Sequence, residues 1–155
     1  MLHPSESPGF LLWHATLRWQ RGLSEALAPL GLTHVQFVLL ACTWWLNDQG
    51  RRPSQIALAE FAGTDVKMTS QVLRGLERKG LIQREVDRED TRARQLRVTR
   101  SGARLAPRAI AIVQQVDAEF FEDVAAEDAM RLLRKLARVP GTDQAHRSDD
   151  HAGSV

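Results

Sequence analysis

The residues best suited to chemistry are the arginines of one short stretch, "DREDTRARQLRVTRSG", residues 87–102, at positions 88, 92, 94, 97 and 100. A guanidinium is planar, weakly hydrated and always charged, so it binds phosphates and enters narrow, electronegative DNA grooves. Residues 51–104 hold 13 Lys/Arg against 7 Asp/Glu, a net +6, whereas the other 101 residues hold 8 against 12, a net −4. Such a basic block favours a nucleic-acid surface; the alternative is a basic face that meets only solvent.

Other chemistry has little support. No nucleophile elbow, Walker loop, paired-glycine fingerprint or zinc spacing occurs, so we predict no catalytic residue, metal or cofactor, and no enzyme. A single cysteine, Cys42, cannot form an internal disulfide, which fits a reducing compartment. No apolar run reaches the roughly 18 residues of a membrane span, and the N-terminus is unlike a signal peptide. We therefore expect a cytoplasmic protein with no membrane partner.

Hydrophobic periodicity predicts a mainly α chain with one small β-hairpin (α+β). Thr33 with Gln36 reads as a capping box, Ser54 as an N-cap and Gly80 as a helix stop. The tail, residues 140–155, is predicted to be disordered. Helices are expected at about residues 8–29, 33–47, 54–63, 64–80, 102–124 and 127–139, and strands at 81–86 and 95–99.

The two short helices separated by Gly63 have the helix-turn-helix layout. Inward candidates are Ile56, Leu58, Ala59 and Ala62 in the first and Val66, Val72, Leu73 and Leu76 in the second. The opposite face of the second helix carries donors for base edges and phosphates. The hairpin that follows would be a wing whose arginine-rich tip reaches the neighbouring minor groove. The predicted DNA-binding residues are Ser54, Lys67, Thr69, Ser70, Gln71, Arg74, Arg88, Asp90, Arg92 and Arg94.

Three landmarks carry a family resemblance: Leu76-Glu77-Arg78-Lys79-Gly80-Leu81, Asp90-Thr91-Arg92 and Thr99-Arg100-Ser101-Gly102. Residues 54–102 resemble the winged-helix core of the MarR family of bacterial transcription regulators, with Thr91 where an arginine is usual, and the flanking helices extend the likeness to residues 8–139. It implies a single domain over 8–139, with a DNA-binding winged helix-turn-helix core at about 33–102 and dimerisation helices at about 8–29 and 102–139. In that wing Asp90 would hold Arg92; the alternative is an ordinary surface ion pair.

The family also implies a homodimer through the first, fifth and sixth helices. The apolar stripes of the last two helices exceed what one small winged domain can cover, which independently favours a partner. Our candidate interface residues are Ile110, Val113, Phe120 and Leu133.

All four tryptophans fall in the first two predicted helices. They are either core packing or the lining of a cleft for a small aromatic effector, as family members bind, and the candidate lining is Trp13, His14, Phe37 and Trp45. We predict a dimeric, sequence-specific regulator that reads a palindromic operator in double-stranded DNA, a repressor released by such an effector. The alternatives are a thiol-switched regulator through Cys42 and an architectural DNA-binding protein without an effector.

Overall fold

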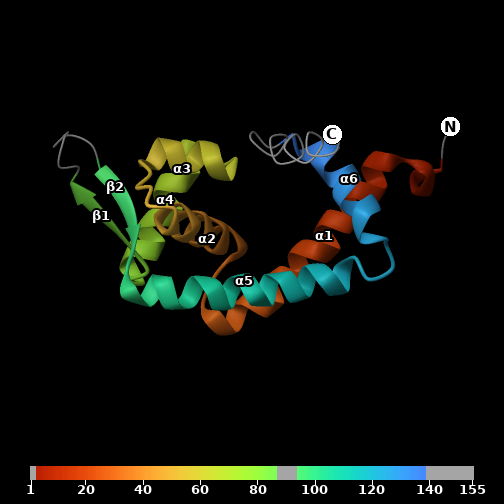
Figure 1. Cartoon of the computed structure of the whole chain (residues 1–155). Helices are drawn as coiled ribbons and strands as arrows, with labels where there is room; N and C mark the ends of the chain where they lie inside the picture. The colour runs from red at the N-terminus through yellow and green to blue at the C-terminus, as the bar shows by residue number, and fades with distance from the viewer. Residues whose placement is uncertain (1–2, 87–93, 139–155) are drawn as a thin grey trace, which may run out of the picture. The chain divides into compact units, whose positions relative to one another are not determined.

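The computed structural model describes residues 3–86 and 94–138. It is mainly helical with one two-stranded antiparallel hairpin, which confirms the predicted fold class (Figure 1). The elements are η1 (Pro4–Glu6), α1 (Pro8–Leu27), η2 (Ala28–Leu30), α2 (His34–Asp48), α3 (Gln55–Ala62), α4 (Val66–Arg78), β1 (Ile82–Val86), β2 (Arg94–Val98), α5 (Arg100–Phe120) and α6 (Ala126–Ala137).

The helix starts follow from local capping chemistry. The Thr33 hydroxyl accepts from the backbone N–H of Gln36, whose side chain accepts from the N–H of Thr33, so the predicted capping box is confirmed. Ser54 caps α3 by accepting from Ala57, and Asp65 caps α4. Each cap satisfies an N–H that the helix itself leaves unpaired.

Helix α5 departs from the prediction at both ends. It begins at Arg100 rather than Gly102, because the Thr99 hydroxyl accepts from the N–H of Gly102 and the chain is already helical there. It ends at Phe120 rather than Val124, since the residues after Phe120 form a turn closed by the N–H of Val124 on the carbonyl of Phe121.

The chain divides into two compact units, residues 1–117 and 118–155, with the boundary inside α5. The first unit has one leucine-rich core to which α1–α5 and both strands contribute. Ile56 is 58% exposed and Val66 is also exposed, so their predicted inward positions were wrong. Fully buried side chains are Leu23 and Leu27 of α1, Leu39, Leu40 and Leu46 of α2, Leu58 of α3, Leu73 and Leu76 of α4, Ile82 of β1 and Leu96 of β2.

In the second unit, α6 is an amphipathic helix in which only Ala129 is buried. Its apolar side chains Met130, Leu132, Leu133 and Leu136 are exposed, although apolar side chains of this size each gain about 1.5–3 kcal/mol when buried. Among the described residues no single helix is long and apolar enough to cross a membrane; only Pro8–Leu30 taken together with His34–Asp48, across a 71° bend, reaches that length and composition.

The hairpin returns to α5 through a close backbone contact at Gly102. The N–H of Thr99 donates to the carbonyl of Leu81 at 3.0 Å, and the Thr99 hydroxyl donates to the carbonyl of Gly80 at 2.6 Å. A Cβ at Gly102 would lie 2.0 Å from the Leu81 carbonyl oxygen. Only glycine therefore fits at this position in the first turn of α5.

Gly102→Ala should lower the free energy of unfolding by about 1–3 kcal/mol or more, since the clash is with backbone and no side chain can move aside. Denaturant unfolding would measure it. The matched control is Gly9→Ala on α1, whose new Cβ meets only the Ser7 hydroxyl at 4.0 Å. If the two alanine variants are equally stable, the proposed tight fit at Gly102 is contradicted.

Candidate nucleic-acid interface

Helix α4 has one buried and one exposed polar face. Leu73 and Leu76 are fully buried against the core, whereas Lys67, Gln71 and Arg74 are exposed. These three positions follow the i, i+4, i+7 spacing of a single helix face, and Ser70 beside them is half-buried. The exposed face thus presents an ammonium, a carboxamide and a guanidinium together.

Thr69 does not belong to that face. It is fully buried, and its hydroxyl bonds the carbonyl of Asp65 at 2.7 Å and the hydroxyl of Thr64 at 2.8 Å. Its assignment as a DNA-binding residue was therefore wrong. The error arose because Thr69 precedes Ser70 and Gln71 in a polar run, whereas a helix turns about 100° per residue and carries it to the core side.

Ser54 is exposed at the N-terminus of α3, next to β2. Its oxygen already accepts the capping bond from Ala57, but the hydroxyl hydrogen remains a donor for an incoming phosphate oxygen. The partial positive charge of the helix N-terminus adds to this preference for anions.

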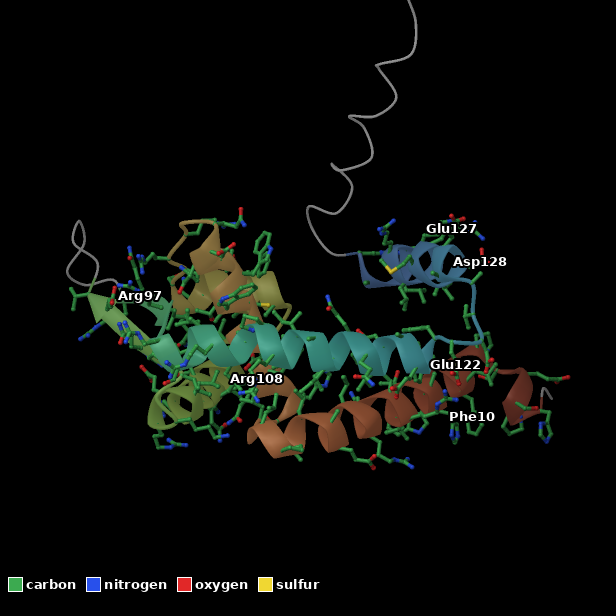
Figure 2. The ribbon with its side chains drawn as sticks, turned by 60° about the horizontal axis from the view of Figure 1, so that its bottom comes forward. Phe10, Arg97, Arg108, Glu122, Glu127 and Asp128 are labelled. Atoms are coloured by element: carbon green, nitrogen blue, oxygen red, sulfur yellow. The ribbon has the colours of Figure 1, made fainter. Side chains whose placement is uncertain are left out.

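The hairpin, together with its connecting residues 87–93, is named the wing below. Arg94 is exposed at the start of β2, and Arg97 projects from the same strand (Figure 2). Two arginines contact carboxylates of the chain itself: Arg97 lies 3.3 Å from Glu85, and Arg84 lies 3.0 Å from Glu77. The predicted residues Arg88, Asp90 and Arg92 lie outside the described residues.

Glu85 stays ionised beside this basic strand. A hydrogen bond from Gln83 to its carboxylate lowers the pKa of Glu85, and the hydrogen bond and positive charge of Arg97 and the charge of Arg52 lower it further. The positive charge of Arg97 is thus partly neutralised by Glu85 within the hairpin. Of the two arginines on this strand, Arg94 is therefore the better candidate for contact with an anion.

Lys79, which follows the last residue of α4, contacts other parts of the chain. The Lys79 ammonium donates to the carbonyl of Gly31 and to the side chain of Gln36, both at 2.6 Å, and so ties the end of α4 to the start of α2. Sequence reasoning missed this role, because these groups are more than 40 positions apart.

The comparisons agree with this geometry. The MarR family model matches residues 32–93. An uncharacterized HTH-type transcriptional regulator of Bacillus subtilis (strain 168), YdcH, is 44% identical over 118 residues, which is 76% of this chain and 80% of that protein. The chain belongs to the MarR family.

Solved MarR-like structures show the same fold at lower identity. CouR from Rhodococcus jostii RHA1, bound to p-coumaroyl-CoA, matches with a TM-score of 0.76 at 23% identity, over 92% of this chain and 98% of that one. The S. aureus MepR–DNA complex matches with a TM-score of 0.75 at 23% identity, over 85% and 95%. At such identities the likeness supports the winged-helix fold alone.

The four candidate effector residues of this MarR-family chain lie in different surroundings. Trp13 is 61% exposed on α1, and His14 packs on Phe10 with ring centroids 4.4 Å apart. Trp45 stacks on Phe61 at 5.5 Å with a 10° interplanar angle. Phe37 packs against the core. The assignment of these residues to an effector cleft stays a prediction.

Sequence reasoning missed a polar contact between α1, α2 and α5. The indole N–H of Trp19 donates to the carboxylate of Asp117 at 2.8 Å, and the ring of His34 lies edge-on to Trp19 at 5.1 Å. Burial lowers the pKa of His34 below its ordinary value, while the charge of Asp117 acts in the opposite direction. These positions are too distant in sequence for any local pattern to join them.

The structure supports neither a redox role for Cys42 nor, within the described residues, a metal site. The Cys42 thiol is partly buried, and burial raises its pKa, which keeps it protonated and slow as a nucleophile. This disfavours the thiol-switched alternative. Within residues 3–86 and 94–138, no group of three or more His, Cys, Asp or Glu side chains is placed to hold a metal ion.

The candidate dimer residues differ in exposure. Val113 is buried in the chain's own core, so its assignment to a dimer interface was wrong. It lies on the side of α5 that also buries Ala109 and Ala106, one and two helical turns away. Ile110 and Phe120 are half-buried, and Leu133 is exposed.

The lowered pKa of His34 predicts a specific acid sensitivity. The unfolded chain binds a proton at His34 more readily than the folded chain does. The part of the free energy of unfolding that depends on His34 should therefore be fully present above about pH 6.5 and should decrease as the pH falls below that value. His34→Gln should show a smaller loss of melting temperature between about pH 7.5 and about pH 5. An unchanged loss in this variant would contradict the assignment of that sensitivity to His34.

Proposed function

We propose that this MarR-family chain is a homodimeric, sequence-specific DNA-binding regulator of transcription. The observation that carries the proposal is the exposed face of α4, where Lys67, Gln71 and Arg74 stand opposite the fully buried Leu73 and Leu76. The major groove, about 12 Å wide, admits a helix with such a face. The fold shared with MepR, which was solved with DNA, supports this use of α4.

The three side chains suit different parts of duplex DNA. A carboxamide such as that of Gln71 pairs with both N6 and N7 of adenine, a pattern that no other base offers in the major groove. Arg74 can pair with guanine or hold a phosphate, and Lys67 at the start of the helix suits a phosphate. Gln71 is therefore the proposed reader of sequence, and Lys67 the proposed backbone contact.

Gln71→Ala should weaken binding to the cognate operator by about 1–3 kcal/mol and change binding to random duplex much less, because the lost contact is to a base. Fluorescence anisotropy with both DNAs would measure this, after footprinting of DNA flanking the gene has located the operator. The matched control, Lys67→Ala, should weaken both complexes alike. Equal losses for Gln71→Ala on both DNAs would show that Gln71 contacts only the DNA backbone, whereas equal affinity of the unchanged protein for a palindrome and for random duplex would favour the architectural alternative.

The wing is proposed to reach the adjacent minor groove. Arg94 supplies a described, exposed guanidinium at the end of β2 next to the connecting residues, and Arg88 and Arg92 add positive charge to the connection. Asp90 is proposed to hold Arg92 in place by a charge-assisted hydrogen bond. A narrow minor groove has an enhanced negative potential, so arginine is the favoured occupant.

The dimer is proposed to use the helices at residues 8–29 and 102–139, which flank the DNA-binding core at residues 33–102. Within the described residues, large apolar side chains are exposed on both segments: Phe10, Leu11, Leu12 and Trp13 in the first, and Val124, Met130, Leu132, Leu133 and Leu136 in the second. Large apolar side chains exposed on a helix in this way are typical of a protein interface. Two copies would present two α4 helices to two operator half-sites.

Replacing both Leu132 and Leu136 by Asp should give a monomer that still folds, since both side chains are 58% exposed and a charge at a closed interface is unfavourable. Analytical ultracentrifugation would measure the mass, and operator affinity should fall with the loss of the second half-site contact. Lys135→Gln, on the same helix, is the control and should stay dimeric. A dimeric double variant would place the interface elsewhere.

The finer regulatory proposal is a repressor released by a small aromatic effector. CouR, which shares the fold, was solved with p-coumaroyl-CoA, an aromatic thioester. Trp13, His14, Phe37 and Trp45 offer rings of suitable chemistry, and an aromatic acid that releases the operator in the anisotropy assay would support their role. The protein would act in the cytoplasm, where the DNA is.

A further inference from the structure

The outer edge of β2 is closed by one side chain of α2. Asn47 is half-buried and stands one residue before the end of α2. Its Oδ1 accepts from the backbone N–H of Val98 at 2.8 Å, while its Nδ2 donates to the carbonyl of Leu96 at 3.2 Å and to that of Arg51 at 3.0 Å. Both polar atoms of the carboxamide are thus used on backbone groups.

The backbone groups along this edge of β2 need both a hydrogen-bond acceptor and a donor, and an amide supplies both. β2 pairs with β1 along its other edge, and the N–H of Leu96 is taken by the carbonyl of Pro53 at 2.8 Å. Asn47 takes the next two backbone groups along the edge. A primary amide offers an acceptor and two donors, as neighbouring peptide groups would, so Asn47 substitutes for a residue of a third strand. A carboxylate lacks the donor, and an alkyl group lacks both.

Packing alone does not fix the strand on this side. Leu96 is fully buried and holds β2 to the core, but apolar contacts have little directional preference. An open groove of about 460 Å³ borders the contact between α2 and β2, and its lining includes Asn47, Arg97 and Val98. On this solvent-facing side the hydrogen bonds of Asn47 and of the Pro53 carbonyl add directional contacts to the pairing of β2 with β1 on its other edge.

We propose that Asn47 is a positioning residue for DNA binding: its carboxamide fixes β2 against α2 and thereby aims the basic wing at the DNA. This inference rests on the proposed function. Arg94 is two residues before Leu96 on the strand that Asn47 holds, so a change in the strand's rotation moves its guanidinium. The three hydrogen bonds that the structure describes for the Asn47 side chain all join backbone groups of the chain itself, so the proposed role is indirect.

The test compares two isosteric amide-to-acid changes. Asn47→Asp turns a donor toward the Leu96 carbonyl into a repelling oxygen; Gln49→Glu adds the same charge at an exposed position two residues away. Operator affinity is measured by anisotropy at several salt concentrations for both variants. For Asn47→Asp, we expect affinity to fall about three- to tenfold beyond the Gln49→Glu control, and the salt slope to flatten by up to about one unit as wing contacts with phosphate are lost.

A double-mutant cycle separates positioning from simple loss of stability. Asn47→Asp should be non-additive with Arg94→Ala on the wing and additive with Gln71→Ala on α4. If Asn47→Asp does not fold, Asn47→Ser can replace it in the same cycle, because it introduces no charge and leaves a shorter side chain beside the open groove. In Asn47→Ser, whose shorter side chain withdraws the acceptor from the Val98 N–H, hydrogen exchange at the Val98 amide should speed up.

The outcomes distinguish the two proposals. Additivity with Arg94→Ala and an unchanged salt slope overturn the positioning role of Asn47 while leaving wing binding intact. If Arg94→Ala itself changes neither affinity nor salt slope, the proposed Arg94 contact fails and the role of Asn47 falls with it. Coupling confined to Arg94 supports the inference, because a general loss of folded protein would weaken all variants in proportion.

Discussion

The structure depends on helix α4 burying one face completely. Leu73 and Leu76 enter a core formed with Leu39, Leu40 and Leu46 of α2, and this burial forces the opposite side chains outward. Each leucine contributes about 1.5–3 kcal/mol, so the helix cannot rotate without losing several such contributions. The orientation of Gln71 and Arg74 is therefore a consequence of the core.

The wing is held by a different kind of interaction. Its two strands are short, and an isolated two-stranded hairpin is marginal in water. Leu96 and Ile82 anchor it in the core. The Pro53 carbonyl and the Asn47 side chain accept hydrogen bonds from the N–H groups of Leu96 and Val98, and the N–H of Thr99 donates to the carbonyl of Leu81. The close contact of Gly102 with the Leu81 carbonyl then holds the first turn of α5 against the residue that precedes β1. Apolar burial gives the wing its stability, and polar groups determine its placement.

Some basic side chains contact other groups of the chain itself, whereas others are exposed and can contact a phosphate. Arg84, Arg97 and Lys79 contact groups of the chain itself, whereas Lys67, Arg74 and Arg94 are exposed. The net charge of the basic segment therefore overstates the number of cations ready to meet a phosphate. The exposed apolar side chains of α1 and α6 show the complementary feature, a surface that the single chain leaves without cover.

The sequence by itself determined what depends on neighbours within about four residues. The caps at Thr33 and Ser54, the left-handed Gly80 and the alternating strands all follow from such local chemistry, and the family landmarks lie in the same segments. Tertiary structure alone decided which side of each element is buried. Thr69 and Val113 turned inward and Ile56 outward because burial depends on what packs against a helix. The hydrogen bonds of Asn47 could not be predicted from the sequence either, because its partners at Leu96 and Val98 become its neighbours only when the core has formed.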